Sequence, residues 1–279
     1  MALYDLFDVP DLEAPVLVGA FEGWVSAGSA GTATALHLAA DAEVVASFDA
    51  DELFDYRVHR PTVDFVDGVI SRVDWPSIEV RLQRFAERDV LVLHGPEPNW
   101  RWQALGSAVA ELAGRLGVVE FVSLGGIPWA APHTRPTVIV TTASRTELID
   151  EDATPPEGLL RVPGAVVSTI ERALTEQGVP AVGFWARVPH YVGGVYFPAV
   201  LALTERLGRH LGISIPVGSL VENAREQRDQ LDRLVEEQPG VSDVVEQLEQ
   251  VFDAQGDVAS GEEIAAEIER FLQDVSGDE

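Results

Sequence analysis

The fold of this chain is decided by residues 89–100, which read Asp-Val-Leu-Val-Leu-His-Gly-Pro-Glu-Pro-Asn-Trp. A short apolar run at 89–94 leads into a loop rich in proline and polar residues, and a helical pattern follows from about Trp100 to Leu116. An apolar run bounded by turn residues predicts a buried strand. The same succession recurs on both sides of this stretch, which is typical of an α/β fold with a mainly parallel sheet and crossover helices.

The same pattern predicts further strands and helices on either side. Strands are expected at residues 15–20, 43–48, 118–124, 137–142 and 181–188, and helices at 27–40, 165–177 and 195–211, with a short helix near 145. The strand at 118–124 is expected to end at Gly125-Gly126. Residues 51–75 are expected to form an excursion with a hairpin, because Asp67-Gly68 separates two β-branched runs. We therefore predict one α/β domain over residues 1–218.

The character of the sequence changes after residue 218. Apolar residues recur at helical spacing over 219–237 and again over 244–252, and Ser260 with Glu263 forms a capping box that opens a third helix. From residue 222 onward, 18 acidic residues stand against four arginines. We predict an acidic helical extension over 219–279, and a solvated helical face is the simplest explanation of its charge.

Composition excludes several classes of function. Cysteine and lysine are both absent, so that disulfides, thiolate catalysis, a Schiff base and a phosphate-loop lysine are ruled out. A net charge of −27 argues against nucleic acid and anionic membranes as partners, because no basic stripe exists to displace counterions. No apolar run is long enough to span a membrane, and the first ten residues lack the basic start of a signal peptide, so we expect a cytoplasmic protein.

The short motifs identify no catalytic or cofactor site. Residues 27–31 approximate a nucleophile elbow, but alanine stands where the first glycine belongs, and small residues opening a packed helix explain the stretch equally well. Gly23, Gly28 and Gly31 do not form a dinucleotide fingerprint. His59 and His94 have no neighbours at metal-ligand spacing. We therefore expect no catalytic residue, no metal and no cofactor.

Polar and aromatic side chains gather in the loops that follow four of the predicted strands. If these strands are parallel, the loops share one edge of the sheet, where α/β folds bind their ligands. The candidates for such a crevice are Glu22, Trp24, Glu97, Trp100, His133, Arg135, His190 and Tyr191. In one interpretation, His133 or His190 is an acid or base and Arg135 holds an anion. In the other, the loops are rigid packed connections or a protein-docking surface, in which Trp and Arg are common.

The same loops resemble the proteasome assembly chaperone two family, and most closely its actinobacterial branch. The similarity covers roughly residues 3–215. The motifs that carry it are Glu22-Gly23-Trp24, residues 46–49, 53–57 and 60–61, residues 95–100, Gly125-Gly126-Ile127-Pro128, residues 132–136 and residues 188–191. The resemblance implies a three-layer α/β/α fold like that of nucleoside phosphorylases and peptidyl hydrolases. It also implies self-association and, from archaeal and eukaryotic relatives, a role in assembling the proteasome core particle.

The favoured hypothesis is a non-enzymatic protein that binds itself and proteasome subunits or another protein. The loops around Trp24, Trp100, Trp102 and Trp129, or the tail helices, would supply the contact surface. The alternative is a ligand-binding protein, or a hydrolase- or phosphorylase-like enzyme, that uses the crevice. A scaffold whose partner is unrelated to proteolysis is the third possibility.

Overall fold

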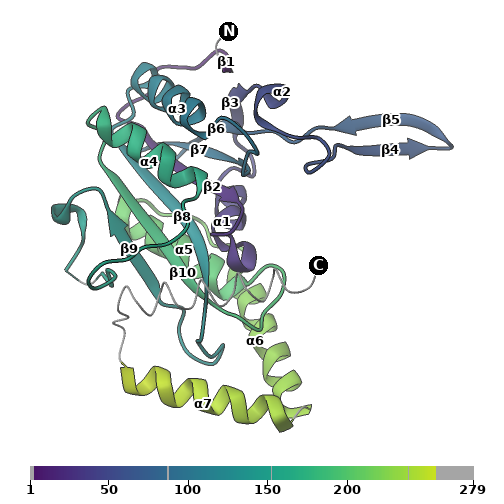
Figure 1. The fold of residues 1–279 in the computed structure, drawn as a ribbon, viewed down its shortest axis with the longest axis vertical. Helices are drawn as coiled ribbons and strands as arrows, with labels where there is room; N and C mark the ends of the chain where they lie inside the picture. Colours follow the sequence, from purple (N-terminus) through teal and green to yellow (C-terminus); the bar gives the residue numbers. More distant parts are fainter. Residues whose placement is uncertain (1–2, 87, 152, 238, 256–279) are drawn as a thin grey trace.

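The computed structural model describes residues 3–86, 88–151, 153–237 and 239–255, and it shows helices on both faces of a large mixed sheet (Figure 1). The eight strands of this sheet lie in the order β1-β3-β6-β7-β2-β8-β10-β9. Their bounds are β1 Tyr4–Leu6, β2 Val16–Glu22, β3 Glu43–Phe48, β6 Glu79–Arg84, β7 Asp89–Pro96, β8 Glu120–Trp129, β9 Ile139–Ala143 and β10 Ala181–Pro189. The predicted α/β/α class is confirmed.

Four neighbouring strands, β7, β2, β8 and β10, run parallel, and the strands toward the two edges of the sheet pair antiparallel. Parallel strands covered on both faces are apolar along their whole length rather than alternating. Strand β2 fits this rule, since residues 16–21 are all buried. The condition set by the sequence, that the four loop-bearing strands are parallel, is therefore met.

The helices cover the sheet because alternate strand residues point to opposite faces. Leu91 and Leu93 of β7 pack with helices α3, Trp102–Leu116, and α4, Val166–Glu176. Val90 and Val92 pack with α1, Ala30–Leu38, and α5, Phe197–Leu211. The two cores lie on opposite faces of the sheet, between the sheet and the helix layers that cover it in Figure 1.

The predicted end of one strand is wrong. Strand β8 does not stop at Gly125-Gly126 but continues to Trp129. The two glycines allow close approach from opposite faces: a Cβ at Gly125 would lie 2.6 Å from the ring of Trp185, and one at Gly126 would lie 2.1 Å from the carbonyl oxygen of Ala27. A glycine inside a strand can therefore indicate a close contact with a neighbouring segment and not the end of the strand.

Three elements were not predicted: β1, β6 and the short helix α2, Ala50–Leu53. Strand β6 carries a visible signal, since Val80 and Leu82 are buried and alternate with charged or polar residues. The predicted helix near Arg145 is a single 3-10 turn, Thr146–Leu148, and a second such turn, Ala27–Ser29, precedes α1.

The predicted hairpin is a two-stranded arm that projects away from the sheet (Figure 1). It consists of β4, Thr62–Val66, and β5, Val69–Asp74. Asp67 and Gly68 form its turn with φ of 52° and 81°, the positive values that a two-residue hairpin turn requires.

The C-terminal segment forms α6, Leu220–Glu237, and α7, Pro239–Gln255, as expected from the periodicity of the sequence. Helix α6 is fixed to the start of α5, because the side chain of Gln227 accepts a hydrogen bond from Phe197 N (2.8 Å) and donates one to Val195 O (2.8 Å). The third predicted helix, beginning at Ser260, lies outside the described residues. Within the part of the chain that is described, no helix combines the length and apolar character needed to cross a membrane.

Candidate functional site

The candidate crevice residues follow the parallel strands, but they fall into separate groups. Glu22, Trp24 and Glu97 lie beside the start of α4. His133, Arg135, His190 and Tyr191 lie on the β8–β9 and β10–α5 loops, against the C-terminal helices. Among the described residues, no hydrogen bond or ion pair joins one group to the other.

The first group ties α4 to the sheet edge. Glu97 N donates to Glu22 O (2.8 Å), and the Glu97 carboxylate accepts from Val166 N (2.7 Å), the first residue of α4. Gly23 makes room for this carboxylate, since a Cβ there would lie 2.9 Å from its Oε2. Burial raises the pKa of Glu97, and the hydrogen bond from Val166 opposes that rise. Glu97 thus acts as a cap for the helix N-terminus, where a negative charge is favourable.

The four tryptophans expected to form a contact surface differ in exposure. Trp24 is half-buried, and its Nε1 donates to Gly164 O (3.2 Å). Trp102 is also half-buried and donates to Pro98 O (2.6 Å), while Trp129 is buried. Trp100 is 53% exposed and stands apart from both groups, its backbone held by Leu53 of α2. Of these four side chains, Trp100 alone offers most of its surface to a partner.

The second group centres on His133, which is only 1% exposed. Tyr191 Oη lies 2.8 Å from both the backbone N and Nδ1 of His133, and His133 Nε2 lies 3.1 Å from Asp232 Oδ1 on α6. The backbone N–H donates to the hydroxyl oxygen, so the hydroxyl hydrogen is left to donate to Nδ1. With this arrangement Nε2 is the ring nitrogen that donates to Asp232. Burial raises the pKa of Tyr191 to about 12, which keeps this hydroxyl protonated.

Arg135 is engaged by carboxylates of the C-terminal extension. Its guanidinium pairs with Asp253 (2.7 Å) and Glu249 (3.1 Å), both on α7. Thr134 also bonds Glu249. The hydrogen bond from Arg135 lowers the pKa of Asp253. The acidic residues Glu249 and Asp253 therefore hold α7 against the β8–β9 loop.

Among the described residues, hydrogen bonds do not link the candidate acid, base and elbow side chains to one another. His190 is exposed, and its Nδ1 lies 3.3 Å from Trp129 O. Ser29 of the elbow-like stretch lines the same open hollow as His190, but within the described residues no hydrogen bond joins the two side chains. No group of three or more metal-ligating side chains occurs in the described part of the chain.

A cavity that the sequence did not predict lies beside the first group. Its volume is about 160 Å³, and it is a partly open cavity between α4, the strands β8, β9 and β10, and the segment at 160–163. Trp24 is the one crevice candidate that lines it. Two further members, Trp185 and Glu171, were missed because each occupies an ordinary position within a predicted strand or helix.

The model of the PAC2 family matches residues 20–235, most of the chain. The chain belongs to the PAC2 family. The resemblance inferred from the loop motifs is thereby confirmed.

Several solved structures resemble this PAC2 chain closely. A protein of unknown function from Mycobacterium tuberculosis is 36% identical with a TM-score of 0.84, and the match covers 91% of this chain and 89% of that one. A PAC2 family protein from Streptomyces avermitilis is 36% identical with a TM-score of 0.74, over 83% and 99%. A proteasome-assembly chaperone homologue from Mycobacterium tuberculosis is 31% identical with a TM-score of 0.76, over 82% and 99%. No curated protein matches the sequence.

Proposed function

We propose that this PAC2 protein is a non-enzymatic, proteasome-assembly-chaperone-like protein that associates with itself. The proposal is supported by the 31% identity to a proteasome-assembly chaperone homologue, 99% of whose length is spanned by the match. It is also supported by the engagement of the candidate residues within the protein, since His133 is bonded to Tyr191 and Asp232, and Arg135 is paired with Glu249 and Asp253.

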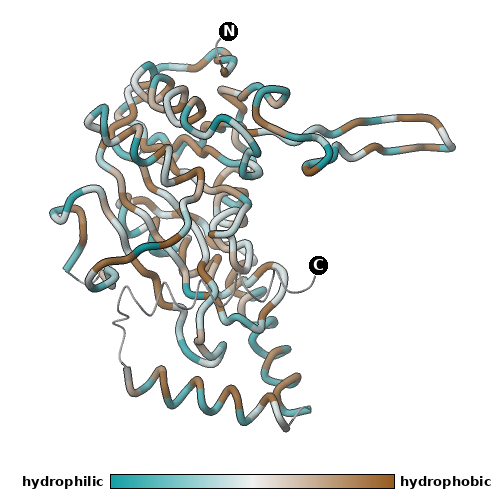
Figure 2. Tube along the Cα trace, viewed as in Figure 1, coloured by the Kyte–Doolittle hydropathy of each residue, from teal (hydrophilic) through white to brown (hydrophobic). Residues whose placement is uncertain are grey.

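The observation that carries the proposal is the exposed apolar surface of the β4–β5 arm. Large hydrophobic side chains are exposed on the arm and its base, and Figure 2 shows hydrophobic segments on both strands. They are Val58, Val63, Phe65, Val66, Val69, Ile70, Val73 and Trp75. A two-stranded ribbon alone is marginally stable in water and needs a further element against its apolar face.

The pairing of the two strands places two of the apolar cross-strand pairs on one side of the arm. Val63 pairs with Val73 and Phe65 with Ile70, and a register shift between Asp64 and Phe65 keeps these two pairs on a common face. The opposite face carries the charged pair Asp64–Arg72 and the pair Thr62–Asp74, with the apolar pair Val66–Val69 next to the turn. The arm is thus amphipathic, although nothing in the described protomer packs on its apolar face.

A second copy of this chain is the occupant that fits the arm. In a two-fold dimer the same apolar face appears on both partners and can cover itself. Both edges of the ribbon also carry backbone groups able to pair with another strand. Self-association through the arm would leave the sheet and the loop groups accessible to proteasome subunits.

Self-association is tested by sedimentation equilibrium of the full chain and of two matched variants. Phe65→Asp and Thr62→Asp each add one negative charge to the same strand, on the apolar and polar faces respectively. Phe65→Asp should shift the protein toward the monomer, and Thr62→Asp should retain the oligomer. A wild-type monomer at micromolar concentration, or equal behaviour of the two variants, contradicts the role of the arm.

The chaperone role is tested by mixing the purified protein with unassembled proteasome α- and β-subunits from the same organism. Native electrophoresis should show a complex with unassembled subunits and faster appearance of assembled particles. Absence of any complex with either subunit, under conditions where the protein is folded by circular dichroism, contradicts the assignment.

A further inference from the structure

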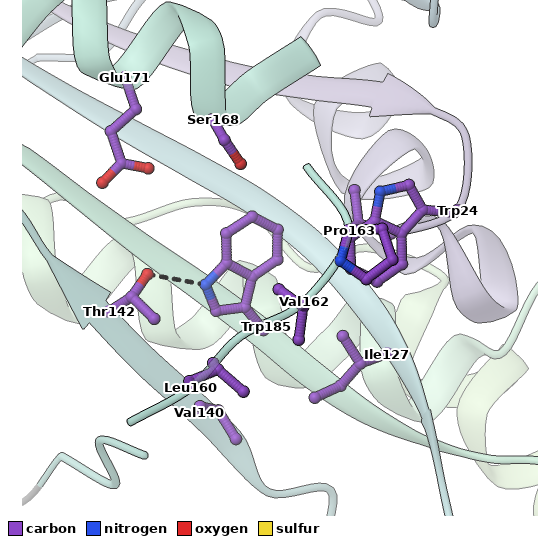
Figure 3. A pocket seen from close by; sticks show the side chains of 11 residues that line it. Trp24, Ile127, Val140, Thr142, Leu160, Val162, Pro163, Ser168, Glu171 and Trp185 are labelled. Atoms are coloured by element: carbon purple, nitrogen blue, oxygen red, sulfur yellow. Dashed lines mark hydrogen bonds between the residues drawn. The ribbon is translucent and has the colours of Figure 1, made fainter. Parts of the chain in front are cut away.

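The cavity beside α4 is lined mainly by apolar and aromatic groups (Figure 3). Aliphatic side chains form one wall, namely Ile127, Val140, Leu160 and Val162. The indole of Trp185 lies across the middle of the view, and Trp24 closes one end beside Pro163. A cavity of about 160 Å³ is close in volume to an engineered cavity of about 150 Å³ that binds benzene, so there is room for one aromatic ring.

One ionisable side chain enters this apolar space. Glu171 and Ser168, one turn apart on α4, both extend toward the indole of Trp185 (Figure 3). Within the described residues, the Glu171 carboxylate accepts no hydrogen bond and forms no ion pair. Of the two uncharged polar side chains on the wall, Ser168 and Thr142, the latter is already engaged, since its Oγ1 accepts from Trp185 Nε1 (2.9 Å). Among the described residues, Glu171 is therefore the one carboxylate that lines the cavity, and none of them pairs with it.

A carboxylate in apolar surroundings is costly unless a cation or a hydrogen-bond donor meets it. Burial accordingly raises the pKa of Glu171. An ammonium group placed beside Glu171 would supply both charge and hydrogen-bond donors. The face of a neighbouring indole also attracts a cation.

The aromatic wall is held in place before any ligand arrives. Trp185 lies opposite Gly125 in the parallel pairing of β10 with β8, and a Cβ on Gly125 would come within 2.6 Å of its ring. A Cβ on Gly183 would lie 2.8 Å from Trp185 Nε1. Glycine at both positions gives the indole its place, and the hydrogen bond to Thr142 fixes its orientation. A preformed wall lowers the entropic cost of binding.

We propose that this cavity binds a small amphipathic amine, with the ammonium group on Glu171 and an apolar body of about one ring against Trp185 and Trp24. The site is separate from the β4–β5 arm, which projects from another part of the sheet (Figure 1). Its occupancy does not depend on self-association or on chaperone activity.

The test uses phenethylamine as the probe and 3-phenylpropionate as its anionic counterpart with the same ring. Isothermal titration calorimetry of the full chain should detect phenethylamine with a Kd of about millimolar strength, as expected for so small a ligand. The anionic probe should bind at least about tenfold more weakly, because it meets Glu171 with like charge.

Variants of matched chemistry identify the carboxylate. Glu171→Gln should weaken phenethylamine binding by about tenfold or more, the effect of losing one charge-assisted hydrogen bond. Glu205→Gln, on the exposed surface of α5 across the sheet, should leave the affinity unchanged. Leu160→Trp, which fills the cavity from a surface segment, should abolish binding while thermal melting shows that the protein is folded.

Three results would overturn the inference. They are no detectable heat or chemical-shift change with about 10 mM phenethylamine, equal affinity for the two probes, or an affinity that Glu171→Gln leaves unchanged.

Discussion

Gly126→Ala is expected to be among the more damaging single-methyl additions in this protein. The new Cβ would lie 2.1 Å from the carbonyl oxygen of Ala27 and 3.3 Å from Cβ of Ala30. The neighbouring backbone cannot withdraw without loss, because Gly126 N donates to Val25 O (2.8 Å) and pairs with Ser26 in a short bridge. Either the two segments separate by about 1 Å, or the substituted strand distorts.

The cost follows from these two consequences. Overpacking of a buried site costs about 1–3 kcal/mol, and leaving the buried N–H without its acceptor costs about 1–3 kcal/mol more. We therefore expect the free energy of unfolding to fall by about 2–6 kcal/mol and the melting temperature to fall by about 10 °C.

Gly114→Ala is the matched control, because Gly114 lies on the exposed face of α3 with open space around its Cα. Removing a glycine from a helix interior should stabilise the protein by about 0.5–1 kcal/mol. Chemical denaturation and thermal melting of both variants measure the two effects. A Gly126→Ala protein that melts within about 1 °C of the wild type would show that the close approach of Ala27 O does not require glycine at this position.

Three further changes have directions set by the structure. Tyr191→Phe leaves the buried N–H and Nδ1 of His133 without their partner, so the free energy of unfolding should fall by about 1–3 kcal/mol in chemical denaturation; no change would mean that water replaces the hydroxyl. Arg135→Ala removes both ion pairs to α7, and amide hydrogen exchange within α7 should rise severalfold while exchange in α3 is unchanged. Arg135 lowers the pKa of Asp253, so the ion pair that anchors α7 is complete above the ordinary aspartate pKa of 3.8 and is lost as the pH falls through the lowered value. In acid, hydrogen exchange within α7 of the wild type should therefore approach that of Arg135→Ala. For Glu171 the sign is reversed, because burial raises its pKa and the wild type therefore loses stability as the pH rises through that pKa. Glu171→Gln should be more stable than the wild type at neutral pH and equal to it below about pH 4. Equal stability of the two proteins at both pH values would contradict a burial cost for the Glu171 charge.

Local pattern was sufficient for most of the fold. Residues 43–48 form β3 with the bounds that were predicted, and Asp67-Gly68 forms the turn of the arm, because alternation and turn chemistry act over a few residues. The error at Gly125-Gly126 has a different origin. A glycine that ends a strand and a glycine that admits an indole are identical in sequence, and Trp185, which decides between them, lies 60 residues further along the chain.

The sequence predicted where the candidate site residues lie, but not which residues they bond to. The parallel strands bring the loops of His133 and Arg135 to one edge, as expected from the topology of such sheets. Their partners Asp232 and Asp253 belong to a tail crowded with acidic residues, separated from them by about a hundred positions. No spacing rule selects one carboxylate from such a set, so the ion pairs emerge only when α6 and α7 are placed.

The most polar of the crevice candidates do not line the cavity beside α4. His133 and Arg135 carry the strongest hydrogen-bonding capacity of the predicted crevice, and both are satisfied by the protein's own tail. Glu97 is likewise engaged, by the first backbone amide of α4. A ligand competes poorly for groups that already have hydrogen-bonding partners in the protein, because it must first break those bonds. Glu171 is different, since it faces an apolar cavity and has no partner among the described residues, and this contrast directs the search for a ligand to α4 rather than to the histidines.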